Sequence, residues 1–445
     1  MSELLSLCEK AVGLAQKKGA DEAEAYGIDQ KETEVALERN DLKLCKSQLR
    51  TGIGLRVLKA KRLGFASVNS LDVEKIEKLA QWAVALASKA PKDKYNALPA
   101  PKPIRRVADI YDKECEAQGS DAIFEQATEM LRAARGHDRR VVVDGGLLNG
   151  TVGERAIFSS HGIQASERES LYNCFLIAFA RDGQDVGSFD HIYEGAHRLR
   201  DIDGAGIGLR LAKRVVKSLG AKRTHSFKGT VLMAPSTVQA VLTYTMESSI
   251  DANNVQKGMS KFAGKIGKPV GSALLNVVDD GTLPGGLGSS SFDREGLPHK
   301  RLPIISKGTL RAFIHNSYTA TKGGCPSTGH AYGAQRNVLM IGATNFIVMP
   351  GRNSKNDLIG ETKKGVLVTR FSGSSETESG DFSGVVKGGF LIENGEITRP
   401  LKETLIAGNS FDLLNNLSGV SKDVENSYNH RLPYMRFEGV TVTGG

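Results

Sequence analysis

Hydrophobic and polar positions divide the first part of the chain into amphipathic helices with strand-like runs between them. Apolar residues recur at helical spacing from Leu4 to Ala15 and from Val73 to Leu86, which predicts two helices with one buried face each. Between them, apolar and polar residues alternate with the period of two that is typical of strands, at residues 33–37, 53–57 and 63–68. This order predicts a module of helices and antiparallel sheet.

The same order returns beyond a proline-rich stretch. Residues 98–103 read Leu-Pro-Ala-Pro-Lys-Pro and break both periods, which predicts a linker. Helical faces follow at Ile123–Ala134 and Ile207–Leu219, and strand-like runs lie between them at residues 141–143, 155–159 and 172–180. No identity at a fixed period links the two modules, so they are alike in pattern only.

Short strands and turns dominate the chain from Gly229 onward. A strand at Thr230–Met233 leads into a helical stretch at Ser236–Glu247, and hairpin turns are expected at Lys307-Gly308 and Asn394-Gly395. Further strands are expected at residues 273–278, 338–340, 345–349, 366–370, 401–407 and 436–443. These strands are enough for a closed or nearly closed β structure.

The predicted fold class is α+β, with two N-terminal helix and antiparallel-sheet modules followed by a glycine-rich, mostly β, barrel-like C-terminal domain. Of the 50 glycines, 30 lie in residues 226–445, as expected for a region rich in loops and hairpins. The expected boundaries are an N-terminal module at residues 1–98, a proline-rich linker at 99–105, a middle module at 106–224 and the C-terminal domain at 225–445.

Composition and charge narrow the class of protein. No run of 18 apolar residues occurs, and Glu3 and Glu9 lie near an N-terminus without a basic flank, so a cytoplasmic protein is expected rather than a membrane or secreted one. The five cysteines lack C-x-x-C spacing and are expected to be reduced thiols. The net charge of +9 is scattered among both signs, which permits contact with nucleic acid but does not favour it.

Two histidine-bearing segments are weak candidates for chemistry. His191–His197 carries two histidines and a glutamate that could ligate a metal, but a solvated segment at a strand-to-helix junction is the favoured interpretation. The loop at residues 324–331 has the glycine spacing of a P-loop without its Lys and its Ser/Thr. Cys325 and His330 remain there as a possible thiol and base, and a Gly/Pro-rich structural loop is favoured over that pair.

The most concentrated acidic region lies within and beside a glycine-rich loop of the C-terminal half. Asp279 and Asp280 precede Gly281, and Asp293 and Glu295 precede Gly296. Carboxylates placed in this way could bind a cation. Asp-Gly and Glu-Gly pairs are also turn formers in their own right, and this second interpretation is favoured.

A series of motifs runs in order through nearly the whole chain. Thr51–Arg56 and Leu63–Ala66 belong to it in the first half. In the second half it comprises Val277–Pro284, Phe292–Gly296, Gly308–Asn316, Asn345–Gly351, Gly365–Arg370, Ser379–Ser383, Ile392–Ile397 and Ile406–Asn409. This series resembles the TldD/PmbA (TldE) metalloprotease family.

The resemblance implies a cytosolic metalloprotease built as a heterodimer of two related subunits, which cleaves flexible or unfolded peptides in an enclosed cavity. The catalytic subunit of that family carries an H-E-x-x-x-H motif on the helix after the first strand of the C-terminal domain, and a cysteine near the C-terminus. Two imidazoles and one thiolate would hold zinc with one position open, and the glutamate would act as the base for the bound water.

This sequence departs from that pattern at each ligand. Where the motif should begin, it has Ala234 and Pro235, with Gln239 a turn later, and no cysteine follows Cys325. Alanine and proline can neither ligate a metal nor take a proton, and glutamine is a poor zinc ligand, whereas Pro235 suits the first residue of a helix. The chain therefore looks like the TldE/PmbA subunit. It is expected to bind no metal itself, and zinc is expected in a TldD-like partner.

The resemblance places the peptide-facing surface in the C-terminal domain, which makes Asp280, Asp293, Arg370 and Asp381 candidates without a catalytic role. Expected partners are a TldD-like subunit and an extended peptide, with a homodimer as an alternative, and neither a membrane nor nucleic acid is expected to be one. Activity is expected only together with the TldD-like partner. Two alternatives remain open: a regulatory protein of the kind described as DNA gyrase modulators, and a self-contained homodimeric peptidase with an atypical site.

Overall fold

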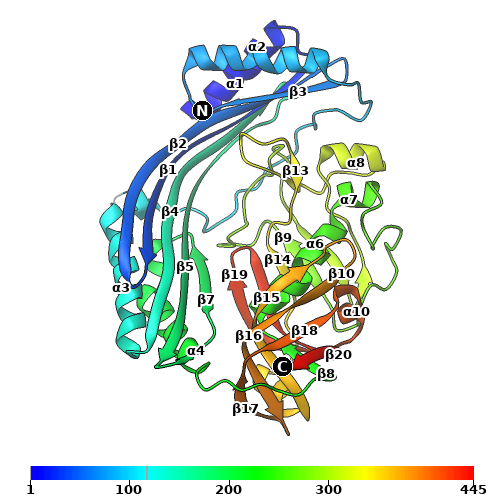
Figure 1. The fold of residues 1–445 in the computed structure, drawn as a ribbon. Coiled ribbons are helices and arrows are strands. Elements are labelled where there is room, and N and C mark those ends of the chain that lie inside the picture. Colours follow the sequence, from blue (N-terminus) through cyan, green and yellow to red (C-terminus); the bar gives the residue numbers. More distant parts are fainter. Residues whose placement is uncertain (1, 117–118, 445) are drawn as a thin grey trace.

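The first half of the chain forms one long, curved antiparallel sheet in the computed structural model, which describes residues 2–116 and 119–444 (Figure 1). The strand order is β3-β2-β1-β4-β5-β6, and β7 also pairs with β5. Because β1 pairs with β2 on one side and with β4 on the other, both predicted modules share this sheet. Its strands are β1 (Glu22–Glu38), β2 (Asp41–Lys59), β3 (Arg62–Val68), β4 (Val141–Ser159), β5 (Gln164–Asp182), β6 (Asp185–Val186) and β7 (Asp190–Ala196).

Helices pack at both ends of the sheet, as the helical spacing of the apolar residues predicts (Figure 1). At one end, α1 (Glu3–Lys17) and α2 (Val73–Lys89) bury their apolar faces in a first core with the sheet. At the other end, α3 (Ser120–His137) and α4 (Gly204–Val216) do the same in a second core. Short 3-10 turns lie at η1 (Lys113–Glu116) and η2 (Leu199–Asp201).

The strands are longer than the alternation of side chains predicts, because glycines that look like interruptions lie inside them. Strand β4 runs without a break through Gly150 and Gly153. A Cβ atom on Gly153 would lie 2.2 Å from the carbonyl oxygen of Asp29 on β1, and one on Gly150 would lie 2.7 Å from the ring of Tyr172 on β5. These glycines therefore permit close packing of long strands rather than ending them.

The C-terminal half contains a closed barrel, which confirms the predicted α+β class. Its strands follow the order β20-β18-β16-β15-β8, and β20 also pairs with β8, so the ring has no open edge. A large apolar core fills it. The barrel strands are β8 (Phe227–Met233), β15 (Lys364–Ser375), β16 (Asp381–Glu393), β18 (Thr404–Asn409) and β20 (His430–Gly444).

Smaller strands extend this sheet beyond the barrel. Asn394 and Gly395 both have positive φ, and so do Lys307 and Gly308, as two-residue hairpin turns require; both predicted hairpins are confirmed. The extension comprises β9 (Val277–Asp280), β10 (Arg301–Ser306), β11 (Thr309–Leu310), β14 (Phe346–Val348), β17 (Glu396–Leu401) and β19 (Leu417–Ser427), and a separate ribbon pairs β12 (Ala331–Tyr332) with β13 (Met340–Ile341).

The predicted helix after β8 is present and contains an irregular turn. It begins as α5 (Pro235–Val238), continues as the π-helical turn η3 (Gln239–Thr243) and ends as α6 (Tyr244–Ile250). Proline occupies the start of the helix, as predicted. The remaining helices are α7 (Ala252–Gln256), α8 (Ser317–Gly323), α9 (Lys355–Gly360) and α10 (Ser410–Asn415). No helix in the described part of the chain is both long and apolar enough to cross a membrane.

Candidate functional site

A cavity of about 720 Å³ lies between the long sheet and the C-terminal domain. The sheet contributes side chains from β1, β4, β5 and β7, and the C-terminal domain contributes the helix with the π turn, the β12–β13 ribbon and the start of β20. Imidazole and phenol groups are prominent in its lining. It brings together many side chains capable of acid-base or hydrogen-bonding chemistry, and we refer to it as the central cavity.

The helix with the π turn presents three polar side chains to the central cavity, namely Gln239, Tyr244 and Glu247. His430, at the first position of β20, lies among them. Its Nε2 is 2.9 Å from Glu247 Oε1, and its Nδ1 is 3.1 Å from Gln239 Nε2. Because an amide nitrogen only donates, Nδ1 accepts and Nε2 carries the proton that it donates to Glu247. Both ring nitrogens of His430 are therefore engaged.

This arrangement does not fit a zinc ion. A zinc ligand must offer a free lone pair, and both nitrogens of His430 are taken up by Gln239 and Glu247. Within residues 2–116 and 119–444, no group of three or more His, Cys, Asp or Glu side chains is arranged to hold a metal ion. Of the residues singled out at the expected motif position, Gln239 lines the central cavity, whereas Ala234 and Pro235 line a second cavity on the other side of β7.

Sequence reasoning missed His430 and Glu247, which lie 183 residues apart. Each taken alone resembles an ordinary surface residue, and only the fold brings them together. One signal was available: the resemblance implies a third metal ligand near the C-terminus, and His430 is the histidine nearest to that end of the chain.

His299 lines another part of the central cavity and is partly buried. Burial, followed by the nearby His330 and Arg155, lowers the pKa of His299 to about 3, so its imidazole is neutral at physiological pH. Its Nδ1 has no hydrogen-bond partner among the described residues. This nitrogen is itself buried, so it adds no hydrogen-bonding position for a ligand.

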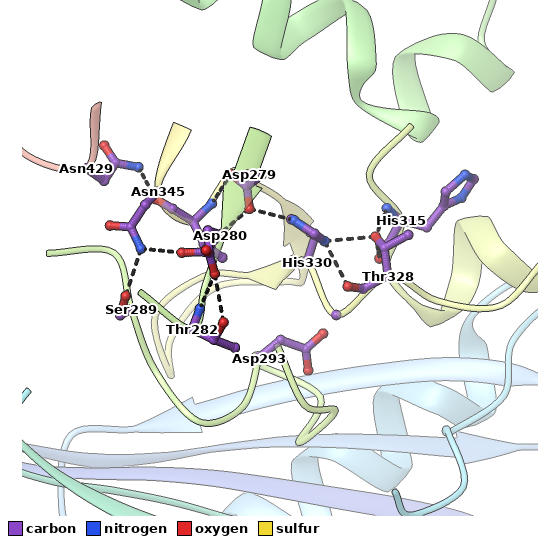
Figure 2. A network of polar contacts seen from close by, with 12 residues as sticks. Asp279, Asp280, Thr282, Ser289, Asp293, His315, Thr328, His330, Asn345 and Asn429 are labelled. Atoms are coloured by element: carbon purple, nitrogen blue, oxygen red, sulfur yellow. Dashed lines mark hydrogen bonds and ion pairs between the residues drawn. The ribbon is translucent and has the colours of Figure 1, made fainter. Parts of the chain in front are cut away.

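The acidic pair at the end of β9 forms a structural network rather than part of the cavity lining (Figure 2). Asp279 Oδ1 is 2.8 Å from His330 Nε2, and its Oδ2 accepts the backbone N–H of Thr344 at 2.9 Å. Asp280 accepts hydrogen bonds from the backbone and hydroxyl groups of Thr282, at 3.0 and 2.7 Å. Figure 2 shows the two carboxylates directed toward these partners. Asp280 thus has the geometry of a turn residue.

His330 is consequently separated from the thiol with which the loop sequence could pair it. Its ring contacts Asp279 and Thr328, while Cys325 is exposed and lies 3.8 Å from Nε2 of His315 instead. Residues 324–331 therefore form a structural loop, the interpretation that the sequence favours, and Cys325 and His330 do not form a catalytic pair.

Asp293 lines the central cavity but its carboxylate is directed into the loop that carries it. One oxygen accepts the backbone N–H groups of Glu295 and Leu297, each at 2.9 Å, and the other accepts that of Ala331 at 3.0 Å. Burial raises the pKa of Asp293, the neighbouring Glu295 adds to this effect, and the three N–H donors oppose it. The hydrogen bonds hold the loop that follows in one conformation.

That loop docks onto the long sheet through buried charges. Arg56 on β2 donates to Glu295 Oε1 at 2.9 Å and to Glu24 Oε2 at 2.8 Å. Arg294 lies 4.0 Å above the ring of Tyr26 and 3.5 Å from Glu24. All of these side chains are largely buried. The segment Asp293–Gly296 is therefore a joint between the two halves of the molecule.

The four candidate peptide-facing residues are not brought together. Asp293 belongs to the joint, and Asp280 is 5% exposed within the turn beside it. Arg370 on β15 donates to the carbonyl oxygen of Phe189, outside the central cavity. Asp381 is exposed at the start of β16, where it accepts a hydrogen bond from Asn409 at 2.8 Å.

Residues 191–196 lie in β7 and His197 directly follows it, at the predicted junction of a strand and a helix, but the prediction that the segment is solvated is wrong. His197 is 7% exposed, and its two ring nitrogens lie 2.6 Å from the carbonyl oxygen of Ser170 and 3.1 Å from that of Gly286. Glu194 pairs with Arg210 on α4. The contact between the two halves of the molecule explains the difference, because the backbone at Gly286 lies against the ring of His197.

Three parts of the chain match families of known description. Residues 23–87 match the PmbA/TldA metallopeptidase domain 1, residues 113–219 match the central domain, and residues 226–444 match the C-terminal domain. Together these matches span most of the 445 residues.

Individual relatives agree with these matches. Metalloprotease PmbA from Escherichia coli O157:H7 is 27% identical over 399 residues, which are 87% of this chain and 85% of that protein. TldE from Thermococcus kodakarensis has a similar structure, with a TM-score of 0.90 and 26% identity over 98% of this chain and 100% of that one. A proposed modulator of a DNA gyrase from Thermotoga maritima gives a TM-score of 0.88 and 28% identity, with 98% and 99% covered.

Proposed function

This chain belongs to the PmbA/TldD metallopeptidase family, and from that premise we propose that it is a TldE/PmbA-like subunit, which binds extended peptides without holding zinc itself. The observation that supports the proposal is that both ring nitrogens of His430 are hydrogen-bonded. It lies beside the helix that follows the first strand of the C-terminal domain, but it is hydrogen-bonded on both sides to Gln239 and Glu247. Without a metal, these residues supply neither a polarised carbonyl nor an activated water.

The central cavity suits an extended peptide. A volume of about 720 Å³ is in the range of small-ligand sites. Among the described strands, β7 pairs with β5 on one side only, so its other edge carries backbone groups that a peptide strand can use. Backbone pairing of this kind gives affinity whatever the side chains of the peptide are.

Catalysis, in this proposal, belongs to a TldD-like partner that carries the H-E-x-x-x-H motif. The direct test measures cleavage of an unstructured peptide by this chain alone, by the partner alone and by both together. We expect cleavage only in the mixture, with loss of activity in a chelator. In the partner, replacing the glutamate of the motif by glutamine should abolish cleavage.

The matched substitution in this chain is His430→Ala. It should leave the zinc content and the chelator sensitivity of the mixture unchanged, because His430 holds no metal in the proposal. Chelator-sensitive cleavage by this chain alone, lost in His430→Ala, would show that the chain is a self-contained peptidase and would refute the proposal. Sizing of the pure chain with and without the partner distinguishes a heterodimer from a homodimer.

A further inference from the structure

A second cavity, of about 1050 Å³, lies between the middle part of the chain and the barrel. One wall is α4 with β7, and the other is formed by β15, β16 and β17 with the end of β19. Figure 1 shows β7 and β19 side by side between the two halves of the molecule, and the two strands are in contact. The cationic side chains that line this cavity are Arg210, Lys213, Arg214, Lys217 and Lys355. We refer to it as the cationic cleft.

Not all of this positive charge is neutralised. Arg214 makes a bidentate pair with Asp190, at 2.8 and 2.9 Å, and Arg210 pairs with Glu194. Lys213 and Lys217 have no carboxylate within 4.0 Å in the described part of the chain, and both are exposed. They are four residues apart on α4 and therefore share one helix face.

The opposite side of the cleft adds one more cation and an apolar surface. Lys355 on α9 lies with its ammonium 5.0 Å from the ring centre of Tyr434, and no carboxylate pairs with it within the part of the chain described. Leu367, Phe390 and Ile397 line the cleft beside it; Leu367 is buried, whereas Ile397 is 46% exposed. An exposed apolar wall opposite free ammonium groups suits a ligand that carries both carboxylates and apolar groups.

The cationic cleft is continuous with the central cavity. His191, Tyr193 and Ser427 line both of them. Two of these residues belong to β7, whose free edge runs along the passage. A single extended strand could therefore pair with β7 where β19 does not contact it, and reach from one cavity into the other.

We infer that the cationic cleft binds an acidic, extended polypeptide segment with carboxylates at alternate positions, held by Lys213 and Lys217. This inference rests on the proposed peptide-binding function and names the class of peptide. The carboxylates are placed at alternate positions of the peptide because of the spacing of the two lysines. Lysines four residues apart on a helix are separated by about 6 Å along its axis, and side chains on one face of a strand recur about every 6.6 Å.

An acidic peptide fits the cleft better than a nucleic acid does. Asp190, Glu194 and Glu425 also line it, so an unbroken row of phosphates would meet three carboxylates as well as the lysines. A peptide can place its carboxylates opposite the lysines and neutral or apolar residues opposite Glu425 and Phe390.

The test measures binding of fluorescein-labelled peptides to the purified chain by anisotropy. One peptide alternates glutamate and serine over about 12 residues, which span about 40 Å when extended, and a second has glutamine for each glutamate. The variant is Lys213→Gln/Lys217→Gln. The matched control is Lys78→Gln/Lys89→Gln on α2, which removes the same charge from two exposed lysines outside both cavities.

We expect the glutamate peptide to bind more tightly than the glutamine peptide, and the cleft variant to lose about 5- to 20-fold in affinity for it, as two partly screened ion pairs would. Added salt should weaken binding. The control variant should bind like the unaltered chain. Equal binding of the two peptides, or equal losses in the two variants, would overturn the inference.

The same binding measurement is made with a single-stranded DNA of equal charge in place of the peptide. If it binds as tightly as the glutamate peptide and is weakened by the same variant, the cleft is a general polyanion site and the inference is wrong. The measurement uses this chain alone, without a TldD-like partner or zinc. Its outcome is thus separate from that of the cleavage experiment, so a failure of this inference can be distinguished from a failure of the proposed function.

Discussion

Replacing Arg56 by methionine should uncouple the two halves of the molecule. The guanidinium joins Glu24 of the long sheet, at 2.8 Å, to Glu295 of the C-terminal domain, at 2.9 Å. Its side chain is 11% exposed, and the two carboxylates are 1% and 0% exposed. Methionine keeps much of the volume of arginine but leaves both carboxylates without their shared cation.

The expected loss follows from this burial. Removing one partner of a buried ion pair leaves an uncompensated charge and costs about 3–5 kcal/mol. Arg294 remains 3.5 Å from Glu24 and limits the loss there, whereas Glu295 keeps a backbone N–H donor from Ser317 at 2.8 Å. Because each carboxylate keeps one other partner, we expect the cost to stay within that range rather than to double.

The loss should also depend on pH in one direction. Burial raises the pKa of Glu24 even beside Arg56, and removal of the cation raises it further. A carboxyl group whose pKa is raised on folding contributes its stability below its ordinary pKa, and that contribution is lost as pH rises through the folded value. The deficit of Arg56→Met should therefore grow as the pH rises above the ordinary pKa of a glutamate.

Urea unfolding followed by circular dichroism measures this deficit, with Arg50→Met as the matched control. Arg50 lies on the same strand and pairs with Glu32 at 3.4 Å, but its side chain is 44% exposed, so its loss should cost less than about 1 kcal/mol. In the double variant Glu24→Gln/Arg56→Met, part of the lost stability should return. If Arg56→Met costs no more than Arg50→Met, or if its deficit shrinks as pH rises, the reasoning about the joint is refuted.

Two further substitutions examine the same region. Gly296 has φ of +74°, and a Cβ there would lie 2.4 Å from Ile163 Cγ2, so Gly296→Ala should lower the free energy of unfolding by about 2 kcal/mol or more. Gly162 has φ of +90° and nothing within 4 Å of such a Cβ, so the control Gly162→Ala should cost about 1 kcal/mol. Equal losses of the two variants in thermal unfolding would contradict the contact with Ile163. Asp279→Ala should cost about 3 kcal/mol or more, because its partners are buried, whereas the exposed Asp381→Ala should leave the unfolding midpoint unchanged.

Local signals in the sequence are enough for most of the helices and hairpins. Apolar residues at helical spacing mark α1 to α4, and Asn394-Gly395 marks a hairpin. The union of both modules in one sheet was not predictable in this way, because β1 pairs with β4 through contacts more than 100 residues apart in the chain. The glycines of β4 misled the prediction of strand length, since their reason lies in neighbouring strands, such as the backbone at Asp29.

The candidate site was predictable only where chemistry depends on residue type alone. Alanine and proline cannot ligate zinc in any fold. Ala234 and Pro235 are therefore enough to predict from the sequence that the expected zinc motif is missing. That His430 meets Glu247 depends on how β20 closes the barrel against the helix. The roles of Asp293 and Glu295 likewise depend on Arg56, which the first half of the chain supplies.

A site that binds peptides through backbone pairing needs a further device to define their position. Pairing along the free edge of β7 is satisfied equally well when the peptide slips by two residues, because side chains then face the same sides as before. Side-chain anchors remove that degeneracy. Carboxylates held by Lys213 and Lys217 would fix the register in the cationic cleft, and the passage along β7 would then determine which residues of the peptide reach the central cavity. A peptide that lacks the acidic pair should therefore be cleaved at several positions by the assembled subunits, and one that carries it at fewer.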